Sequence, residues 1–80
     1  MASYSKQEKL LCKLLRELRI ERKMTQIELA KKVRFEQQVV SKIENGHRRL
    51  YATQLFQYVS DGFDLSPSEF AAIYEEAERR

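Results

Sequence analysis

The chain has 80 residues, of which 42% are hydrophobic and 34% are charged. A chain of this length forms one small domain that buries only about 60% of its unfolded surface. No stretch approaches the roughly 18 apolar residues of a membrane span. A single cysteine and a single histidine cannot by themselves form a disulfide or a four-ligand zinc site. We therefore expect a single domain, residues 1–80, in the reducing cytoplasm, with no membrane contact, no metal, no cofactor and no enzyme activity.

The charge is distributed unevenly along the chain. Positions 1–60 contain 13 basic and 6 acidic residues, a net charge of +7, whereas positions 61–80 contain 2 basic and 6 acidic residues, a net charge of −4. A surface of one sign attracts partners of the opposite sign. The first sixty residues are therefore expected to face a polyanion. The last twenty residues, which are acidic, are expected to have a different role.

Apolar residues at helical spacing, without any alternating strand pattern, predict an all-α fold, a compact five-helix domain. The first helix is predicted at about 6–22, after a capping-box pattern formed by Ser5 and Glu8. Its core stripe consists of four leucines, Leu11, Leu14, Leu15 and Leu18. Cys12 lies about a quarter-turn from this stripe and is expected to be half-buried, whereas Ile20 lies opposite the stripe and is expected to be exposed.

The second helix is predicted at about 26–33, after a second capping-box pattern formed by Thr25 and Glu28. The third helix is predicted at about 37–45 and is expected to end at Gly46, because glycine readily adopts positive φ. At 100° per residue, the third helix separates into two faces. The core face holds Val39, Val40 and Ile43. The polar face holds Gln37, Gln38, Ser41 and Lys42.

The fourth and fifth helices follow a basic loop. The fourth helix is predicted at about 52–61, and Phe63 and Leu65 are expected to return to the core after it. Its expected core face consists of Ala52, Leu55, Phe56 and Val59. The fifth helix is predicted at about 67–79, because the sequence SPSE at 66–69 supplies an N-cap, a first-turn proline and a capping-box acid. One face of this helix holds Phe70, Ile73, Tyr74 and Ala77.

The segment Leu15–Gly46 reads LRELRIERKMTQIELAKKVRFEQQVVSKIENG, and it closely resembles the helix-turn-helix domains of the phage repressor and Cro type, also called the Xre family. Arg19, the pair Thr25-Gln26 and the segment Ser41–Gly46 carry the resemblance, each at the family's spacing. The resemblance implies a lambda-repressor-like fold whose third helix enters the major groove of double-stranded DNA. It further implies a sequence-specific transcriptional regulator, a repressor, that binds a palindromic operator as a homodimer.

Residues of the third helix align with the base-reading positions of the family. These residues are Gln37, Gln38 and Lys42. Their chemistry agrees with this role, since a glutamine amide pairs bidentately with adenine and a lysine ammonium donates to guanine. Ser41 is small enough to let the backbone approach the groove. Val39 either touches a thymine methyl group or belongs to the edge of the core.

Phosphate contacts are expected around the third helix, at Gln26, Arg34, Asn45, Arg48 and Arg49, and the resemblance implies those of Gln26, Arg48 and Arg49. Gln26 is expected to bond a phosphate and to support the first recognition glutamine. Arg48 and Arg49 either contact phosphates or form a solvated basic loop. Arg34 precedes the third helix and is expected to reach a flanking phosphate.

Arg19 and Glu44 align with an ion pair that, in the family, ties the first helix to the end of the third. We expect a partly buried pair, because an exposed pair would contribute little. Lys23 and Arg34 stand where the family usually has glycine. Since a non-glycine residue at positive φ costs on the order of 1 kcal/mol, either the turns are reshaped or the two cations gain a contact with DNA. Glu36 replaces the family's small hydroxyl cap and is expected to accept from the helix N-terminus.

The fifth helix is acidic apart from Arg79 and Arg80, so it is expected to stay away from DNA. Its apolar face either packs on the core of the same chain or forms a homodimer contact. The resemblance favours the homodimer, because a two-fold axis matches a palindromic operator. The expected dimer contacts are Phe70, Ile73, Tyr74 and Ala77.

Small controllers of restriction-modification genes, phage Cro-like switches and antitoxins share these features. The main alternative is an antitoxin or adaptor protein that acts by binding a second protein, such as a toxin or regulator; a toxin-like neighbouring gene would favour it. A membrane-surface peptide, based on the basic amphipathic first helix, is less consistent with leucines that serve the core. A hydrolase is weaker still, because no serine, threonine or cysteine has a plausible base and orienting acid.

Overall fold

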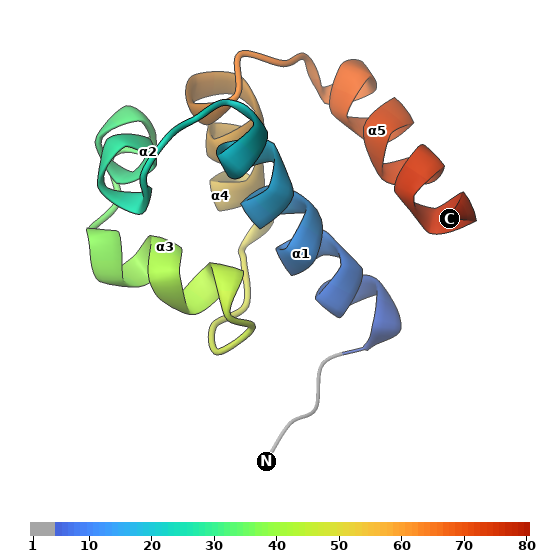
Figure 1. Ribbon diagram of the computed structural model, residues 1–80, viewed down its shortest axis with the longest axis horizontal. Coiled ribbons are helices and arrows are strands. Elements are labelled where there is room, and N and C mark those ends of the chain that lie inside the picture. Colours follow the sequence, from blue (N-terminus) through green and yellow to red (C-terminus); the bar gives the residue numbers. More distant parts are fainter. Residues whose placement is uncertain (1–4) are drawn as a thin grey trace.

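The computed structural model describes residues 5–80 as helices joined by short connections (Figure 1). In chain order the elements are α1 (Lys6–Glu21), α2 (Gln26–Val33), α3 (Gln37–Glu44), α4 (Ala52–Gln57), the π-helical turn η1 (Tyr58–Gly62) and α5 (Pro67–Arg79). No strand occurs among the described residues, so the all-α fold with five helices is confirmed. The predicted fourth helix corresponds to α4 together with η1, because its last turn widens into a π-helix.

Local hydrogen bonds explain why three of the helices begin where they do. Ser5 Oγ accepts from the Glu8 N–H at 3.1 Å, and the Glu8 carboxylate accepts from the Ser5 N–H at 2.9 Å. The same reciprocal bonds start α2, between Thr25 and Glu28, and α5, where Pro67 occupies the first turn. All three capping boxes predicted from the sequence are therefore confirmed.

The start of α3 differs from the prediction. Glu36 is the N-cap residue, but its side chain makes no capping hydrogen bond. A cap acceptor lies on a short side chain, so that its oxygen reaches the second or third N–H of the helix. The glutamate side chain is longer than the side chains that usually serve as caps, which is why the expected bond does not form.

Three turns among the described residues contain a positive φ without glycine, at Lys23, Arg34 and Asp64, and the first two are the turns that the sequence singled out. Lys23 has φ 56° between α1 and α2, and Arg34 has φ 64° between α2 and α3. Both turns close by backbone hydrogen bonds, since the Met24 N–H donates to the Arg19 carbonyl at 3.2 Å and the Phe35 N–H donates to a carbonyl of α2 at 3.0 Å. The alternative that the turns are reshaped is therefore wrong, because both residues adopt the left-handed conformation that glycine usually supplies.

The buried face of α4 and η1 also differs from the prediction. Phe56 is 55% exposed, Ala52 is exposed and Leu55 is half-buried, whereas Tyr58 is completely buried. Val59 is buried and Leu55 packs against the core, as predicted, so the prediction was wrong only for Ala52 and Phe56. The face that docks is turned toward Tyr58 and Gly62. A Cβ atom at Gly62 would lie 2.8 Å from Leu29 Cδ1, so the absence of a side chain allows α2 to approach η1 closely.

The core joins the inner faces of all the helices. Tyr58 lies between Phe35 and Phe63, with ring centroids 5.8 and 6.0 Å away, and Leu65 packs at the edge of the core as predicted. Cys12, expected to be half-buried, is buried beside the leucine stripe of α1, and Ile20 is exposed as predicted.

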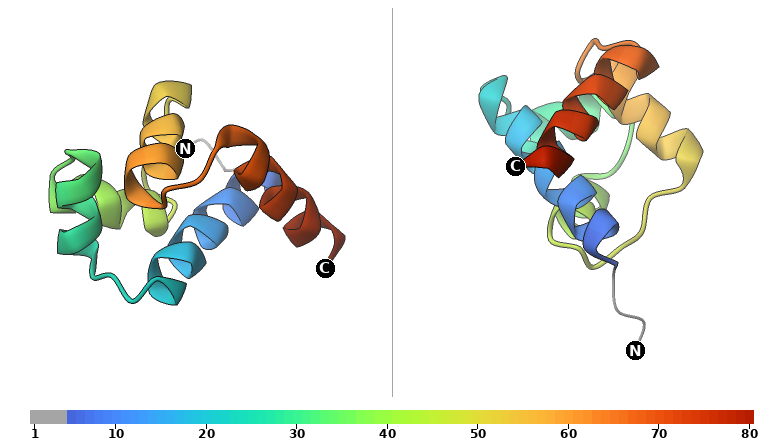
Figure 2. Two further views of the ribbon diagram at one scale, coloured as in Figure 1. Left: turned by 90° about the horizontal axis from the view of Figure 1, so that it is seen from above. Right: turned by 90° about the vertical axis from the view of Figure 1, so that its right-hand side faces the viewer.

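The arrangement separates two ends of the molecule. The helices α2 and α3 lie at one end of the longest axis and α5 lies at the other (Figures 1 and 2). The helix α1 packs against both α3 and α5, so it connects the two ends. Among the described residues, no helix is both long enough and apolar enough to cross a membrane.

Candidate nucleic-acid interface

The outer face of α3 is polar because its inner face is anchored. Val40 and Ile43 are completely buried, and this anchoring turns Gln37, Gln38 and Lys42 outward, where all three are exposed. Two further residues of this helix lie between the faces and are half-buried, Val39 and Ser41. Val39 packs against the core, in line with the core-edge alternative for this residue.

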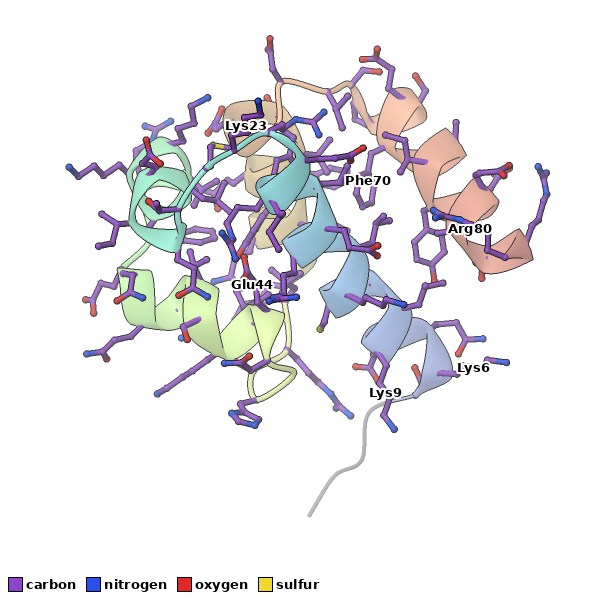
Figure 3. The ribbon with its side chains drawn as sticks, viewed as in Figure 1. Lys6, Lys9, Lys23, Glu44, Phe70 and Arg80 are labelled. Atoms are coloured by element: carbon purple, nitrogen blue, oxygen red, sulfur yellow. The ribbon has the colours of Figure 1, made fainter. Side chains whose placement is uncertain are left out.

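A buried ion pair fixes the end of α3 against α1. Arg19 Nε and Nη2 donate to the Glu44 carboxylate at 2.7 and 3.0 Å, and the side chains are only 11% and 1% exposed. Arg19 Nη1 also donates to the Met24 carbonyl at 2.8 Å, which ties the turn before α2 to the same guanidinium. In Figure 3, Glu44 points into the space between α3 and α1. The pair that the family resemblance implied is thus present and buried.

The ion pair continues into a chain of amide hydrogen bonds. Gln26 Nε2 donates to Glu44 Oε1 at 3.1 Å, and Gln37 Nε2 donates to Gln26 Oε1 at 2.9 Å. The first polar residue of α3 is therefore connected to the buried carboxylate through the first residue of α2. We refer to Arg19, Glu44, Gln26 and Gln37 as the relay. The bond between Gln26 and Gln37 confirms the expectation that Gln26 supports the first recognition glutamine. The bond from Gln26 to Glu44 was not expected from the sequence.

The loop after α3 packs against the start of α1. Gly46 adopts φ 74°, and the following N–H, of His47, donates to the Lys42 carbonyl at 2.8 Å, which ends the helix as predicted. Arg49 Nε lies 3.0 Å from Glu8 Oε2, an ion pair that the sequence did not reveal. Arg48 in the same loop is exposed to solvent only in part.

Asn45 and Arg34, which were also predicted to contact phosphates, lie outside the relay. Asn45 lies at the end of α3, where it forms the C-cap. Arg34 points from the turn before α3 toward Asp61 of η1, with 3.4 Å between Nη2 and Oδ2. Lys23 lies in the α1–α2 turn, at the opposite end of α1 from Lys6 and Lys9 (Figure 3). Arg34 and Lys23 therefore do not join the relay.

The face of α5 that was expected to form a dimer is partly used within the chain. Phe70 and Ala77 are buried in the core, and Phe70 points inward in Figure 3, whereas Ile73 and Tyr74 are half-buried. Ala77 thus packs against the core of its own chain, whereas the small exposed part of Phe70 lines a surface groove. Beside Tyr74 a groove of about 510 Å³ opens between α1, α4 and α5, with Leu11 and Leu55 in its lining.

One buried side chain near the relay has an unusual environment. The hydroxyl of Tyr58 has no hydrogen-bond partner among the described residues. Burial, together with the nearby Glu44 carboxylate, raises the pKa of this phenol far above its usual value. The sequence reasoning missed Tyr58, because its position placed it outside the stripe assigned to the core.

Two short helices joined by a tight left-handed turn, the second with an anchored inner face and an exposed polar face, define a helix-turn-helix DNA-binding domain. The Helix-turn-helix family model matches residues 15–70. The chain belongs to this family, of the Cro/C1 type, whose members are DNA-binding regulators.

Solved structures support the fold. The chain is similar to the crystal structure of the wild-type restriction-modification controller protein C.Esp1396I, at 23% identity and a TM-score of 0.89, with 96% of this chain and 100% of that chain covered. A single-substitution mutant of the same controller protein gives 23% identity and a TM-score of 0.90, with 98% of each chain covered. No curated protein sequence matches the chain.

Proposed function

We propose that the protein is a sequence-specific transcriptional repressor that binds a palindromic operator as a homodimer, with α3 in the major groove. The observation that carries this proposal is the relay, which connects the first side chain of the exposed face of α3 to a buried ion pair. A side chain held in this way loses little conformational entropy when it meets a base. A merely solvated glutamine would not need such support.

The base contacts follow from the outer face of α3. Gln37 and Gln38 carry amides that match the donor and acceptor of adenine, and Lys42 carries an ammonium that matches the two acceptors of guanine. Ser41, half-buried between them, lets the helix backbone approach the bases. Val39 reaches a thymine methyl group only with the part of its side chain that the core leaves exposed.

The phosphate contacts surround this face. Gln26 uses one N–H on Glu44 and retains a second N–H for a phosphate oxygen. Asn45 and Arg48 extend the contact beyond α3. Arg49 and Arg34 each meet a carboxylate in the free protein, so each exchanges a carboxylate for a phosphate on binding. This exchange reduces what the two arginines add to affinity.

The homodimer contact lies at the groove beside α5. Phe56 is 55% exposed on α4 and directly follows Leu55, which lines the groove with Tyr74. A two-fold axis here lets Phe56 of one copy enter the groove of the other, so that the same patch serves both copies. The helix α5, which lines the groove, and α3 lie toward opposite ends of the molecule (Figure 1), whose longest extent is 33 Å. Binding to a palindromic operator requires the two recognition helices of such a dimer to lie about one DNA turn, roughly 34 Å, apart.

The proposal is tested by incubating the protein with a random DNA duplex library at about 150 mM salt, where non-specific binding is weak, and sequencing the retained DNA. We expect a palindrome with half-sites about 10 base pairs apart. A promoter that contains this palindrome should lose transcription when the protein is added in vitro. Binding that disappears with salt and enriches no motif would contradict sequence-specific regulation, and transcription that rises would contradict repression.

A second candidate function is an adaptor or antitoxin that acts by binding another protein. The apolar groove favours it, because an exposed apolar surface typically marks a protein contact. The two candidates differ in solution. An adaptor remains a monomer until its partner is present and enriches no DNA motif, whereas the proposed repressor is a dimer by itself.

A further inference from the structure

We infer that Glu44 determines the base preference of Gln37 without touching DNA, by fixing the direction of two glutamine amides. The direction chosen favours adenine over guanine at one position of each half-site. This inference rests on the proposed function, since it requires that Gln37 reads a base. It assigns to Glu44 a positioning role in specificity beyond its role in stability.

The buried carboxylate of Glu44 fixes the direction of the Gln26 amide. Its side chain is 1% exposed and is held by two N–H groups of Arg19. A carboxylate paired with a guanidinium only accepts hydrogen bonds. The amide of Gln26 therefore has to turn its nitrogen toward Glu44, as observed at 3.1 Å. A reversed amide would place two acceptors against each other in a buried place, at high cost.

Gln26 in turn fixes the direction of the Gln37 amide on α3. With its nitrogen on Glu44, Gln26 presents its oxygen to Gln37, and an amide oxygen is again only an acceptor. Gln37 therefore has to turn its own nitrogen inward, as observed at 2.9 Å. One N–H of Gln37 is used in this bond, so the side chain presents one N–H and one oxygen to its surroundings.

The remaining N–H and oxygen of Gln37 match one purine better than the other. In the major groove adenine offers one acceptor, N7, and one donor, the N6 amino group, which match one N–H and one oxygen. Guanine offers two acceptors, N7 and O6, which need two donors. A reversed Gln37, accepting through its oxygen, would have both N–H groups free for guanine. The orientation of the Gln37 amide, which the relay fixes, therefore determines whether Gln37 prefers adenine or guanine.

The test changes Gln26 so that the amide of Gln37 has to turn round. Glu44 itself is kept, because its removal would leave the buried Arg19 without its partner and unfold the domain. In Gln26→Lys, the ammonium donates to Glu44 and can donate again to the oxygen of Gln37, but it cannot accept. Gln37 then turns its nitrogen outward. We expect the ratio of adenine to guanine at one position of each half-site to fall at least about tenfold, with guanine gained and other positions unchanged.

Two control variants show whether a changed base preference comes from the direction of the amide. One removes the hydrogen bond without adding a donor, and the other adds the charge at a different position. Gln26→Met has a similar length and no donor, so it should weaken the adenine preference without creating a guanine preference. Ala72→Lys adds the same charge on an exposed position of α5 and should leave the motif unchanged. Circular dichroism melting of each variant shows whether the fold is retained.

The outcomes distinguish the inference from the function on which it rests. If the wild-type protein enriches no motif, the proposed function fails. If the wild-type protein enriches a motif and folded Gln26→Lys retains the same adenine preference at every position, the role of Glu44 is overturned while the proposed function stands. A guanine preference that appears equally in Gln26→Met would also overturn it, since direction would then not be the cause.

Discussion

Arg19 binds both carboxylate oxygens of Glu44, at 2.7 and 3.0 Å, across the space between α1 and α3. The two residues are 25 positions apart in the sequence, and their contact joins the end of α3 to α1 in addition to the packing of Val40 and Ile43 in the core. Because both side chains are almost completely buried, each charge depends on the other for compensation. The stability of the domain should therefore respond strongly to the removal of either partner.

Arg19→Met should lower the free energy of unfolding by about 3–5 kcal/mol, because it leaves the buried Glu44 carboxylate without a cation. Urea denaturation measures this change. The matched control is Arg34→Met, which removes the exposed pair with Asp61 and should cost less than about 1 kcal/mol. Equal losses of stability in the two variants would show that burial of the Arg19 pair has no energetic consequence.

Tyr58→Phe should leave the fold intact and raise the free energy of unfolding by about 1 kcal/mol, because it removes a buried hydroxyl that has no hydrogen-bond partner among the described residues. The ring contacts with Phe35 and Phe63 remain. Tyr58→Ala should instead cost about 3–5 kcal/mol, since it leaves a cavity in the core. Thermal denaturation compares the two variants. A decrease in stability in Tyr58→Phe would mean that the hydroxyl has a stabilising partner.

The capping boxes make the domain sensitive to acid. The backbone N–H of Ser5 lowers the pKa of Glu8 below its ordinary value of 4.5, and the corresponding bonds lower the pKa of Glu28 and Glu69. A carboxyl whose folded pKa is lowered stabilises the protein above its unfolded pKa, and this stabilisation is lost as the pH falls through the folded pKa. The melting temperature should therefore fall as the pH decreases below about 4.5.

The control for the acid effect is a variant in which all three glutamates become glutamine, which retains the capping hydrogen bond without a titrating group. Its melting temperature should depend less on pH in this window than that of the wild-type protein. Identical pH profiles would assign the acid sensitivity to other carboxyl groups.

The capping boxes were easier to predict from the sequence than the contacts between helices that are far apart in the chain. Each capping box lies within four consecutive residues, so its pattern is visible directly. The buried face of α4 and η1 depends on the close approach of α2 to Gly62, and the sequence contains two apolar stripes that could dock. Only the folded contact decides in favour of Tyr58 over Phe56.

The candidate site shows the same limit. The exposed face of α3 and the pair formed by Arg19 and Glu44 were expected, the latter only through the resemblance to a family. The bond from Gln26 to Glu44 joins residues 18 positions apart, and the ion pair of Arg49 with Glu8 depends on how the loop after α3 folds back. No local pattern encodes either contact.

Phe56→Glu should convert the proposed dimer into a monomer, because it places a charge in an apolar contact beside the acidic residues Glu75 and Glu78 of the groove. Phe56 is exposed in the single chain, so the fold should be unaffected. Light scattering gives the solution mass, and a DNA footprint should shorten from two half-sites to one. Ile20→Glu, at an exposed position on α1, is the matched control and should leave both measurements unchanged. A dimer that survives Phe56→Glu would place the interface elsewhere.

Lys42→Ala and Arg48→Ala should weaken DNA binding in different ways, because one side chain is proposed to read a base and the other a phosphate. Lys42→Ala should relax the preference for guanine at one position, at a cost of about 1–3 kcal/mol on the preferred sequence. Arg48→Ala should weaken binding to all sequences alike and reduce the slope of log K against log salt by about one, since it removes a single phosphate partner. Fluorescence anisotropy across a salt series, on the selected operator and on single-base variants of it, measures both effects. An unchanged motif in Lys42→Ala together with a reduced salt slope would reassign Lys42 to the phosphate backbone.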